Sequence, residues 1–441
     1  MQYILSLDFG TSSLKASILN ERLETIKSIK EEYQFEVLND DKIELNPDEL
    51  FKAFVKCSHM LNDFMPKVDM LVYDTFSPSV IFMDASGDYL YPVITHLDRR
   101  SLNQSNEILK YFGEDRYQEI TGVLPFAGGV SLTSILWIKE NIPEVFSKAY
   151  KIAHFNTYFY RKLTGFWGID HVNASMTGIY ETVKDSGWSD DICETFGINK
   201  GKLPDVIYAG NVYGHLLKSI SELTGLKEGI PVAFGTNDAA ISQIGAGNSN
   251  SGDILNISGS SEILSIITDR PILDKKYYIR KAVSPGKWQI FSIVTGGFAI
   301  EWFRKEFFRE IDKDKFYGDY LEKLIKKNCK NIEVEFSPYL TGDRHSLIKK
   351  RGSFSGLTLS TTRDDMLLSI LYGIHKPILE VFNLASSFLK LNNTIKITGG
   401  LSSNPSIVDL KRNIFKNYNF QVVNDCSIIG NAKLALQSIK K

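Results

Sequence analysis

Two short apolar runs separated by a polar turn open the chain. Residues 3–7 are mostly apolar and end at Asp8, residues 10–13 are small or hydroxylated, and residues 15–19 are again mostly apolar. Short apolar runs bounded by turn residues are typical of strands, so we expect a β-hairpin here. A glycine lets such a turn bend, and its hydroxyl and N–H donors suit a phosphate. An aspartate that only caps its own turn fits the pattern equally well.

Helical spacing begins at Asn46. This residue suits an N-cap, Pro47 suits the first helical turn and Glu49 suits a capping box, and apolar residues then keep helical spacing through Phe64. The same patterns predict further elements along the chain. They are strands at 70–73, 79–83, 231–234 and 394–398, helices near 131–141 and 143–163, a long helix after Thr362 kinked at Pro377, and a final helix after the turn at 399–405.

A second strand–turn–strand pattern occupies residues 253–267, with Ser258-Gly259-Ser260-Ser261 as its turn. It echoes the N-terminal hairpin, and 441 residues are too many for one ordinary core. We therefore expect a duplicated α/β fold with domains at 1–245 and 246–441 and a cleft between them.

Composition narrows the class of protein. Hydrophobic residues make up 43% and charged residues 23%, and the net charge is −1, which gives no electrostatic case for nucleic acid or an acidic membrane. No apolar run is long enough to span a bilayer, and Asp8 interrupts the N-terminal run, so a signal peptide is not expected. The cysteines form no CxxC pair, which predicts free thiols in a cytoplasmic protein; they are Cys57, Cys193, Cys329 and Cys426.

A carboxylate between a predicted strand and a helix start is the second chemical candidate. Asp238 follows Gly235-Thr236-Asn237. It suits a general base that takes a proton from a substrate hydroxyl, and a helix cap is the plainer interpretation. The turn with Gly399-Gly400 and Asn404 could let a flat ligand lie on the backbone, or be an ordinary strand-to-helix turn.

Other phosphate and nucleophile designs are excluded by the sequence. Gly247 and Gly252 have the spacing of a Walker loop, but Asp253-Ile254 follows where Lys-Ser/Thr is required. No dinucleotide-binding G-x-G-x-x-G helix, G-x-S-x-G elbow or H-E-x-x-H pair occurs. His96 and His154 are expected to be structural.

Seven segments in order resemble the FGGY carbohydrate kinases of the actin/hexokinase/Hsp70 superfamily, in the branch of the xylulose and ribulose kinases. The resemblance extends from Asp8 to about Leu436. Its segments are Asp8-Phe9-Gly10-Thr11-Ser12-Ser13, His96-Leu97-Asp98-Arg99-Arg100, residues 170–175, Gly235-Thr236-Asn237-Asp238, residues 258–261, Thr295-Gly296-Gly297 with Glu301-Trp302, and Gly399-Gly400 with Asn404.

The resemblance implies two ribonuclease H-like, actin-type ATPase domains, each a mixed five-stranded sheet flanked by helices. The first would bind sugar and the second nucleotide. It also implies ATP and Mg²⁺ as cofactors, with Asp8 and Asp238 holding the metal and meeting across the interdomain gap. Asp238 would be the general base. The nucleotide would be bordered by Thr11, Ser12 and Ser13 at the γ-phosphate, Gly259 and Ser260 near the β-phosphate, and Gly297, Glu301, Gly400 and Asn404 toward the nucleoside.

Departures from the family pattern bear on the substrate. Phe76-Ser77 stands where the glycerol kinases carry Arg-Glu, Ser77-Pro78-Ser79 stands where many xylulose kinases carry Met-His-Gly, and His96 replaces a tryptophan. Glycerol is disfavoured, and a ketopentose such as xylulose or ribulose, or a related polyol, is expected. The candidate sugar contacts are Phe76, Ser77, His96, Asp98, Asn173 and Asp238. A buried ion pair of Asp98 with Arg99 is the structural alternative.

Two other classes stay open. One is an actin-like or Hsp70-like ATPase without sugar chemistry, and the other is a catalytically silent sugar sensor. Retained Asp8 and Asp238 favour the kinase, whose partner would be a small sugar or polyol. A homodimer is compatible with the resemblance.

Overall fold

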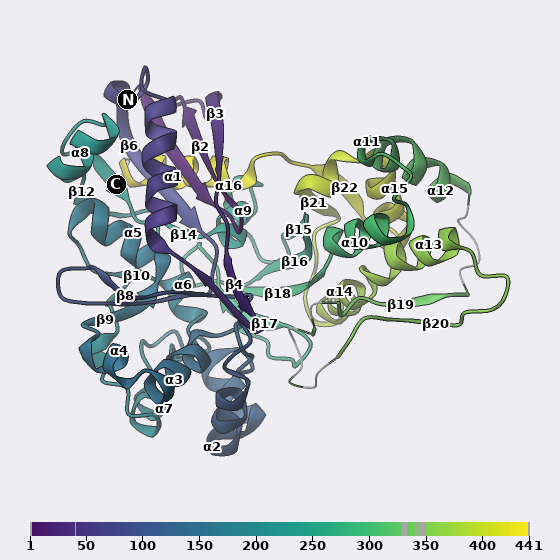
Figure 1. The fold of residues 1–441 in the computed structure, drawn as a ribbon, viewed down its shortest axis with the longest axis horizontal. Coiled ribbons are helices and arrows are strands. Elements are labelled where there is room, and N and C mark those ends of the chain that lie inside the picture. Colours follow the sequence, from purple (N-terminus) through teal and green to yellow (C-terminus); the bar gives the residue numbers. More distant parts are fainter. Residues whose placement is uncertain are drawn as a thin grey trace. The chain divides into compact units, whose positions relative to one another are not determined.

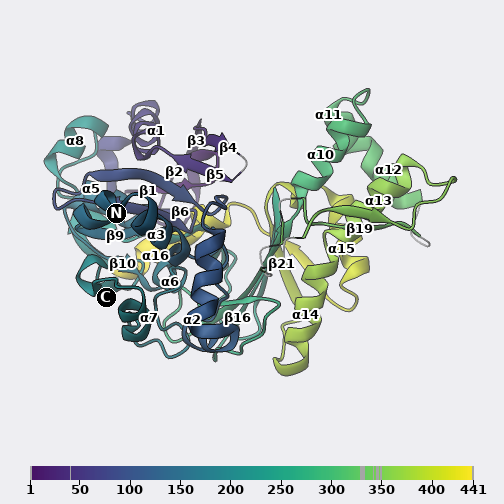
Figure 2. The ribbon, with the colours of Figure 1, turned by 60° about the horizontal axis from the view of Figure 1, so that its bottom comes forward.

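The computed structural model describes residues 2–39, 41–327, 333–340, 342–343, 347 and 350–439. These fall into two compact units (Figures 1 and 2). Unit 1 comprises the described parts of Met1–Gly247, Ile279–Lys287 and Asp425–Lys441, and unit 2 comprises those of Asn248–Tyr278 and Trp288–Asn424.

Unit 1 is built on a seven-stranded mixed sheet in the order β12-β13-β6-β1-β2-β3, with β14 also pairing with β6. The N-terminal hairpin is antiparallel, and β1 is parallel to β6. The strands are β1 (Tyr3–Phe9), β2 (Ser13–Leu19), β3 (Thr25–Glu32), β6 (Val68–Thr75), β12 (Val212–His215), β13 (Pro231–Ala233) and β14 (Thr236–Asn237).

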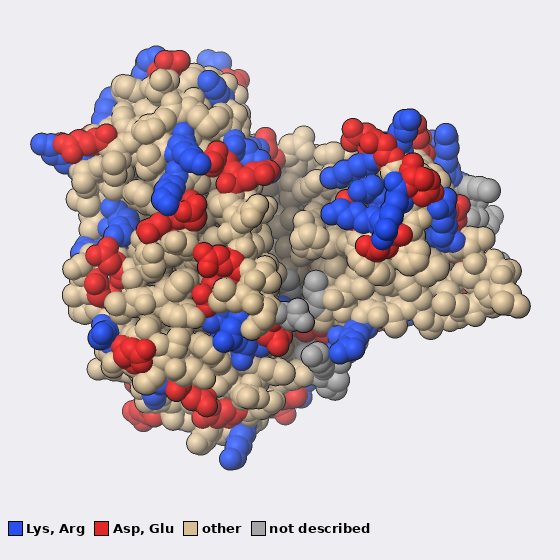
Figure 3. Space-filling model, in the orientation of Figure 1, with Lys and Arg blue, Asp and Glu red and all other residues tan. Residues whose placement is uncertain are grey.

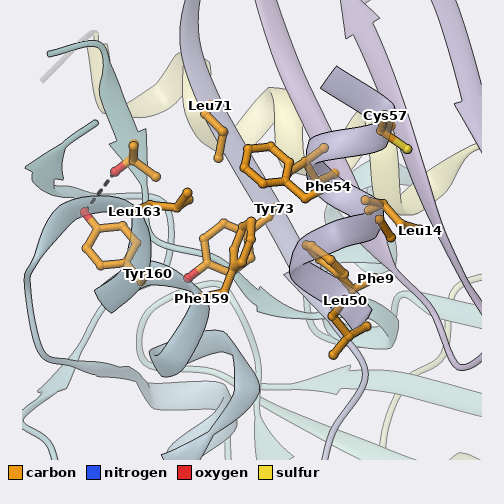
Figure 4. Packing of buried hydrophobic residues seen from close by; sticks show 14 of the residues in the cluster. Phe9, Leu14, Leu50, Phe54, Cys57, Leu71, Tyr73, Phe159, Tyr160 and Leu163 are labelled. Atoms are coloured by element: carbon orange, nitrogen blue, oxygen red, sulfur yellow. Dashed lines mark hydrogen bonds between the residues drawn. The ribbon is translucent and has the colours of Figure 1, made fainter. Parts of the chain in front are cut away.

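Apolar side chains on one face of this sheet form a core cluster of unit 1 with α1 and α5. Helix α1 (Pro47–Met60) lays Leu50 and Phe54 against β1 and β2, and Phe159 of α5 (Phe155–Thr164) packs against Phe9 (Figure 4). Tyr160 is buried, and its hydroxyl donates to the Val232 carbonyl oxygen at 2.9 Å. This places α1 and α5 over the sheet and fixes the strand ends that carry the candidate site.

A second sheet of unit 1 runs in the order β4-β5-β8-β7-β9. Its strands are β4 (Glu36–Asn39), β5 (Lys42–Leu45), β7 (Ser79–Met83), β8 (Tyr89–Thr95) and β9 (Lys151–His154). The other elements of unit 1 are a 3-10 turn η1 (Met65–Lys67), α2 (Leu102–Thr121), interrupted at Gly113, α3 (Ser131–Asn141), α4 (Pro143–Lys148), β10 (Ile169–Asp170), α6 (His171–Ser175), α7 (Asp190–Thr195), η2 (Lys200–Lys202), β11 (Val206–Ile207), α8 (Lys218–Thr224), α9 (Asp238–Gly245) and α16 (Cys426–Ile439).

Unit 2 holds five strands of a mixed sheet in the order β18-β16-β15-β21-β22. They are β15 (Ile254–Ser258), β16 (Ser261–Thr268), β18 (Trp288–Thr295), β21 (Thr394–Thr398) and β22 (Asn419–Val422). The chain returns to unit 1 through β17 (Tyr278–Lys281). The remaining elements of unit 2 are α10 (Gly297–Phe307), α11 (Lys313–Lys315), a π-helical turn η3 (Phe316–Tyr320), α12 (Leu321–Lys327), β19 (Glu335–Ser337), β20 (Ser353–Ser355), α13 (Arg363–Gly373), α14 (Lys376–Phe388), η4 (Gly400–Ser403) and α15 (Pro405–Ile414).

Both predicted hairpins, the helix after Asn46 and the strand at 394–398 are confirmed. The single helix predicted near 143–163 is wrong, because β9 separates α4 from α5 and pairs with β7. A short apolar run has the same composition in a buried strand as in a helix, which explains the error. The helix after Thr362 ends at Gly373 rather than bending at Pro377, and this proline stands in the first turn of α14, where no N–H is needed.

The predicted final helix, α15, is followed by β22 and α16. Helix α16, yellow in Figure 1, lies against the purple strands of unit 1, and its Ile428 and Ala432 are buried with Ile4 and Met70. The predicted boundary at 245/246 therefore differs from the compact units at α16 and at residues 279–287. The roles assigned to the two domains stay predictions. The mixed sheets flanked by helices are confirmed, and the main sheet of unit 1 is two strands wider than predicted.

Charged side chains of both signs are interspersed on the face shown in Figure 3. In the part of the chain that the structure describes, no helix is both long and apolar enough to cross a bilayer. Cys57, Cys193 and Cys426 are buried free thiols, and Cys329 lies outside the described residues.

Candidate active site

The first hairpin of unit 1 presents a small polar turn beside a carboxylate. The Gly10 N–H donates to the Ser13 carbonyl oxygen at 3.0 Å and closes the turn. Ser12 is exposed, and Thr11 and Ser13 are half-buried, so their donors lie at the surface of the unit. Asp8, at the end of β1, accepts a hydrogen bond from the Ser427 hydroxyl of α16. The turn therefore presents small polar residues beside a carboxylate, and its role in phosphate binding stays a prediction.

A second aspartate, which the sequence analysis missed, lies beside Asp8. Asp74 of β6 is the parallel register partner of Asp8, so both side chains leave the sheet on the same face. Its carboxylate is fully buried and accepts a hydrogen bond from Asn431 Nδ2 of α16 at 2.5 Å. Burial, followed by the charges of Asp8 and Asp238, raises the pKa of Asp74 well above its usual range. The sequence signal was available: like Asp8, this residue ends an apolar run.

Asp238 completes the acidic group and is the first residue of α9. The helix cap is its neighbour: the Asn237 side chain accepts from the Ala240 N–H at 3.1 Å. Asp238 is therefore not the N-cap of this helix. Its carboxylate accepts instead from the Ala239 N–H at 2.7 Å and from Asn237 Nδ2 at 2.8 Å. Burial, followed by the charge of Asp8, raises the pKa of Asp238 to about 7.

Asp8, Asp74 and Asp238 therefore belong to one electrostatic group within unit 1. Both Asp8 and Asp238 lie in unit 1, inside the first predicted domain at 1–245, so their meeting does not bridge two domains. The charges of all three carboxylates also affect Tyr33. Burial and then the charges of Asp8, Asp238 and Asp74 raise its pKa. Its hydroxyl donates to the Gly10 carbonyl oxygen, in the turn that is predicted to bind phosphate.

An arginine not singled out from the sequence lies near the general-base candidate. Arg280 is buried, with 6% of its surface exposed, and its positive charge lowers the pKa of Asp238 against the two larger upward effects. It lies in β17, in the stretch 279–287 that belongs to unit 1. A buried cation beside a carboxylate is suited to an anionic ligand group as well as to Asp238 itself.

Ser77 and Asn173, two predicted sugar contacts, are joined in one buried polar network. Ser77 Oγ donates to Asn173 Oδ1 at 2.5 Å, and this oxygen also accepts from His154 Nδ1 at 2.8 Å. Burial lowers the pKa of His154 to about 4, so the ring is neutral at pH 7 with its proton on Nδ1, while Nε2 accepts from Ser131 Oγ at 2.6 Å. The structural role expected for His154 is confirmed.

Asp170 anchors this network to the Asp238 segment. Its carboxylate accepts from Asn173 Nδ2 at 2.6 Å, which fixes the orientation of that amide, and from Thr236 Oγ1 at 2.7 Å. Thr236 lies two residues before Asp238. The network therefore holds Ser77 and the general-base segment in one rigid frame. Asn173 is fully buried and its oxygen is fully used, so it positions Ser77 within this frame.

Of the other predicted sugar contacts, Phe76 and Asp98 are buried and His96 is half-buried. Phe76 is 2% exposed and packs near the His96 ring, with centroids 6.0 Å apart. Asp98 is fully buried, and its ion-pair partner is Arg100 at 2.7 Å, not Arg99. Arg100 also pairs with Glu44 at 2.7 Å. The bracing alternative for Asp98 is thus supported, with a different arginine.

The three glycine-containing segments of unit 2 converge. The Gly297 N–H donates to the Gly259 carbonyl oxygen at 2.8 Å, and the Gly296 N–H donates to the Ser260 carbonyl oxygen at 3.0 Å. Gly399 has φ +99°, and a Cβ added there would lie 2.5 Å from the Ser258 carbonyl oxygen. We call Gly259, Gly296, Gly297, Gly399 and Gly400 the glycine cluster. Gly296 is buried, three of the others are half-buried and Gly400 is exposed. The absence of side chains leaves room for a ligand that lies against the main chain.

Glu301 and Asn404, both predicted on the nucleoside side, meet at Tyr317. The Tyr317 hydroxyl donates to Glu301 Oε2 at 3.1 Å, and Asn404 Nδ2 donates to the Tyr317 carbonyl oxygen at 2.6 Å. Asn404 also caps α15, accepting from the Ser406 N–H at 3.0 Å. Glu301 pairs with Arg304 at 3.0 Å, so its carboxylate is already engaged within unit 2.

Among the described residues, no group of three or more Asp, Glu, His or Cys side chains has the arrangement of a complete metal cage. Asp8 and Asp238 are hard oxygen donors that fit a Mg²⁺ ion completed by water and phosphate oxygens, which is how this ion is usually held beside nucleotides. The residues present are therefore compatible with the predicted metal.

Proteins to which this chain is similar include several sugar kinases. The gluconokinase of Bacillus subtilis is 27% identical over 434 residues, covering 94% of this chain and 83% of that protein. The xylulose kinase of Lactococcus lactis is 27% identical over 432 residues, covering 95% and 84%. The crystal structure of gluconate kinase from Lactobacillus acidophilus has the same fold, with a TM-score of 0.90, 23% identity and coverage of 100% of this chain and 89% of that chain.

A family model also matches directly. Residues 3–245, more than half of the chain and including Asp8, Asp74 and Asp238, match the N-terminal domain of the FGGY family of carbohydrate kinases. With the sugar-kinase fold and the paired hairpins already described, the chain belongs to the FGGY family of carbohydrate kinases.

Proposed function

We propose that this carbohydrate kinase transfers the γ-phosphate of ATP to a hydroxyl of a small neutral sugar, a ketopentose such as xylulose or ribulose, with Asp238 as general base. Membership of the family makes the chain a phosphotransferase that acts on sugar hydroxyls. The observation that carries the assignment of the base is the Asp238 carboxyl, whose pKa is raised to about 7. A general base works best when its pKa lies near the working pH.

In the proposed reaction, Asp238 removes the proton from the sugar hydroxyl as its oxygen attacks the γ-phosphorus. The new O–P bond forms while the bond from this phosphorus to the β–γ bridging oxygen breaks, and ADP leaves. Thr11, Ser12 and Ser13 would orient the γ-phosphate, and Gly259 and Ser260 the β-phosphate. Mg²⁺ held by Asp8 and Asp238 would neutralise phosphate charge. Alignment and charge neutralisation supply most of the catalysis in such transfers.

The direction of the Ser77 hydrogen bond supports a neutral sugar as the substrate. Its hydroxyl hydrogen is donated to Asn173 Oδ1, whose orientation Asp170 determines. Ser77 Oγ therefore faces a ligand as an acceptor, and it suits a sugar hydroxyl that donates. A carboxylate, which has no donor, does not suit this position.

A sugar acid is the second candidate, because a specific observation favours it. Arg280 places a buried positive charge near Asp238, and the gluconokinase of Bacillus subtilis is among the relatives. A guanidinium pairs well with a carboxylate. The same charge would also suit a transferring phosphoryl group, so its presence does not choose between the two substrates.

The experiment is an ADP-release assay with Mg-ATP across ketopentoses, ketohexoses, polyols and sugar acids. We expect the highest kcat/KM for a ketopentose. Ser77→Ala should raise KM for that sugar about 2- to 12-fold, the value of one ordinary hydrogen bond, and leave KM for ATP unchanged. A preference for sugar acids would select the second candidate. No response to any sugar would favour the silent sensor.

The cytoplasmic location, a homodimer and the division of roles between the units remain parts of this proposal. Unit 1 would hold the sugar and the catalytic base, and unit 2 would hold the nucleoside on its glycine cluster. Sedimentation of the purified chain tests the dimer.

A further inference from the structure

A buried ion pair lies next to the glycine cluster of unit 2. Lys411 of α15 is 0% exposed and Glu262 of β16 is 1% exposed. The Lys411 ammonium donates to Glu262 Oε1 and to Asn256 Oδ1, the latter at 2.6 Å. These three side chains come from two strands and one helix that meet in the interior of the unit.

Glu262 holds the predicted β-phosphate hairpin from inside. It is the register partner of Ser258 across the turn that contains Gly259. Its Oε2 accepts from Ser258 Oγ at 2.9 Å, and its Oε1 accepts from Asn256 Nδ2 at 2.6 Å. One carboxylate therefore bonds to both the end and the middle of β15, and it leaves the turn itself open on the other side.

Lys411 connects the same carboxylate to the predicted nucleoside loop. It lies on α15, whose N-cap, Asn404, directly follows η4 and the glycines at 399 and 400. The Lys411 side chain takes a position in the apolar stripe of this helix, next to Leu410 and between Ile407 and Ile414. A helix of this length is stiff, so a bond at Lys411 fixes the direction in which its N-terminus points.

The pair is balanced in charge. His375 Nδ1 lies 3.7 Å from Glu262 Oε1, and burial lowers the pKa of this ring to about 3, so it carries no charge at neutral pH. A buried ion pair is a weak source of stability, because apolar side chains of similar volume often replace it without loss. What an apolar pair cannot supply is the set of directed bonds to Ser258 and Asn256.

We propose that Glu262 and Lys411 are positioning residues for the nucleotide, which hold the hairpin at 258–261 and the loop at 399–404 at a fixed spacing. The backbone of these two segments is then already in place when a nucleoside diphosphate or triphosphate binds against it. This inference rests on the proposed function, in which the glycine cluster binds ATP.

The first test measures binding of Mg-ADP by calorimetry to the full chain and to the variant Glu262→Leu/Lys411→Met. We expect the melting temperature of this variant to stay near that of the wild type, while its dissociation constant for Mg-ADP rises at least tenfold. In turnover, KM for ATP should rise and KM for the sugar should not. A double variant that melts and binds Mg-ADP as the wild type does would overturn the proposal.

A milder pair of variants keeps the test sharp if the double variant does not fold. Ser258→Ala removes the bond from Glu262 to the hairpin and leaves the ion pair intact. Ser265→Ala is its matched control, because this serine is also fully buried and also donates to a side chain at 2.9 Å, Gln289 Oε1, but lies farther along β16 from the turn. We expect Ser258→Ala to weaken Mg-ADP binding severalfold more than Ser265→Ala does.

Equal binding by these two serine variants would also overturn the proposal. A wild-type chain that binds no Mg-ADP while remaining folded would instead remove the proposed function, and with it this inference. The two failures are distinguished by the wild-type measurement alone.

Discussion

The two units carry their chemistry in opposite ways. In unit 1, Asp8, Asp74 and Asp238 gather at neighbouring strand and helix ends, and their mutual charge and burial raise the pKa values of Asp74 and Asp238. In unit 2, the glycine cluster offers backbone groups, and the charges beside it are already paired as Lys411 with Glu262. Unit 1 therefore holds carboxylates whose ionised forms are disfavoured, whereas the buried charges beside the glycine cluster of unit 2 are paired.

The largest effect on turnover should come from a substitution of Asp238, one of these carboxylates. Asp238→Asn keeps the size of the side chain but removes its ability to accept a proton, so we expect kcat to fall about 100- to 10,000-fold. Binding of Mg-ADP should persist, because the proposed nucleoside contacts lie in unit 2. Rates from the coupled ADP-release assay and calorimetry on the same preparation measure both. Turnover within a few fold of the wild type would take the role of base away from Asp238.

A substitution at Gly399 should destabilise unit 2, whereas one at the neighbouring Gly400 should be tolerated. Gly399→Ala places a side chain at φ +99° and within 2.5 Å of the Ser258 carbonyl oxygen, whereas a Cβ at Gly400 meets nothing within 4 Å. We expect Gly399→Ala to destabilise the protein by about 1–3 kcal/mol. Gly400→Ala is the control and should melt near the wild type. Equal melting temperatures would show that the backbone approach at Gly399 does not constrain unit 2.

Site residues could be predicted from the sequence where a local pattern marks them. Asp8 and the turn at 258–261 were found because local patterns mark them: a carboxylate at the end of an apolar run, and small residues between two strands. Asp74 has the same local mark, but the predicted strand stopped at residue 73. Its importance depends on parallel pairing with Asp8, which no local pattern reveals.

Long-range packing accounts for the other omissions. Lys411 stands in an apolar helical stripe, where its charge signals a buried partner, but Glu262 lies 149 residues away. Arg280 returns to unit 1 after residues 248–278 of unit 2, and α16 returns after the rest of that unit. Such returns follow from which apolar faces remain uncovered in three dimensions, so the order of elements along the chain does not determine them.

A smaller effect, on the melting temperature, tests whether the ionised form of Asp74 is disfavoured in the folded chain. The pKa of Asp74 is raised, so its ionised form is disfavoured in the folded chain and costs stability as the pH rises above the ordinary value of the carboxyl group. Asp74→Asn removes that cost. We expect its melting temperature to exceed that of the wild type by an amount that grows between pH 4 and pH 8. Asp63→Asn, at an exposed carboxyl, is the control and should show no such trend.

The smallest effect refines the electrostatics of the base itself. If Asp238 must be ionised to accept a proton, kcat/KM should rise with pH and level off above an inflection near 7, the pKa of its carboxyl group. The positive charge of Arg280 lowers this pKa, so Arg280→Met should move the inflection to higher pH and lower the rate at pH 7 more than at pH 9. Lys287→Met changes a half-buried cation in the same returning segment and serves as the control. If the inflection does not move in Arg280→Met, the charge of Arg280 does not set the pKa of Asp238.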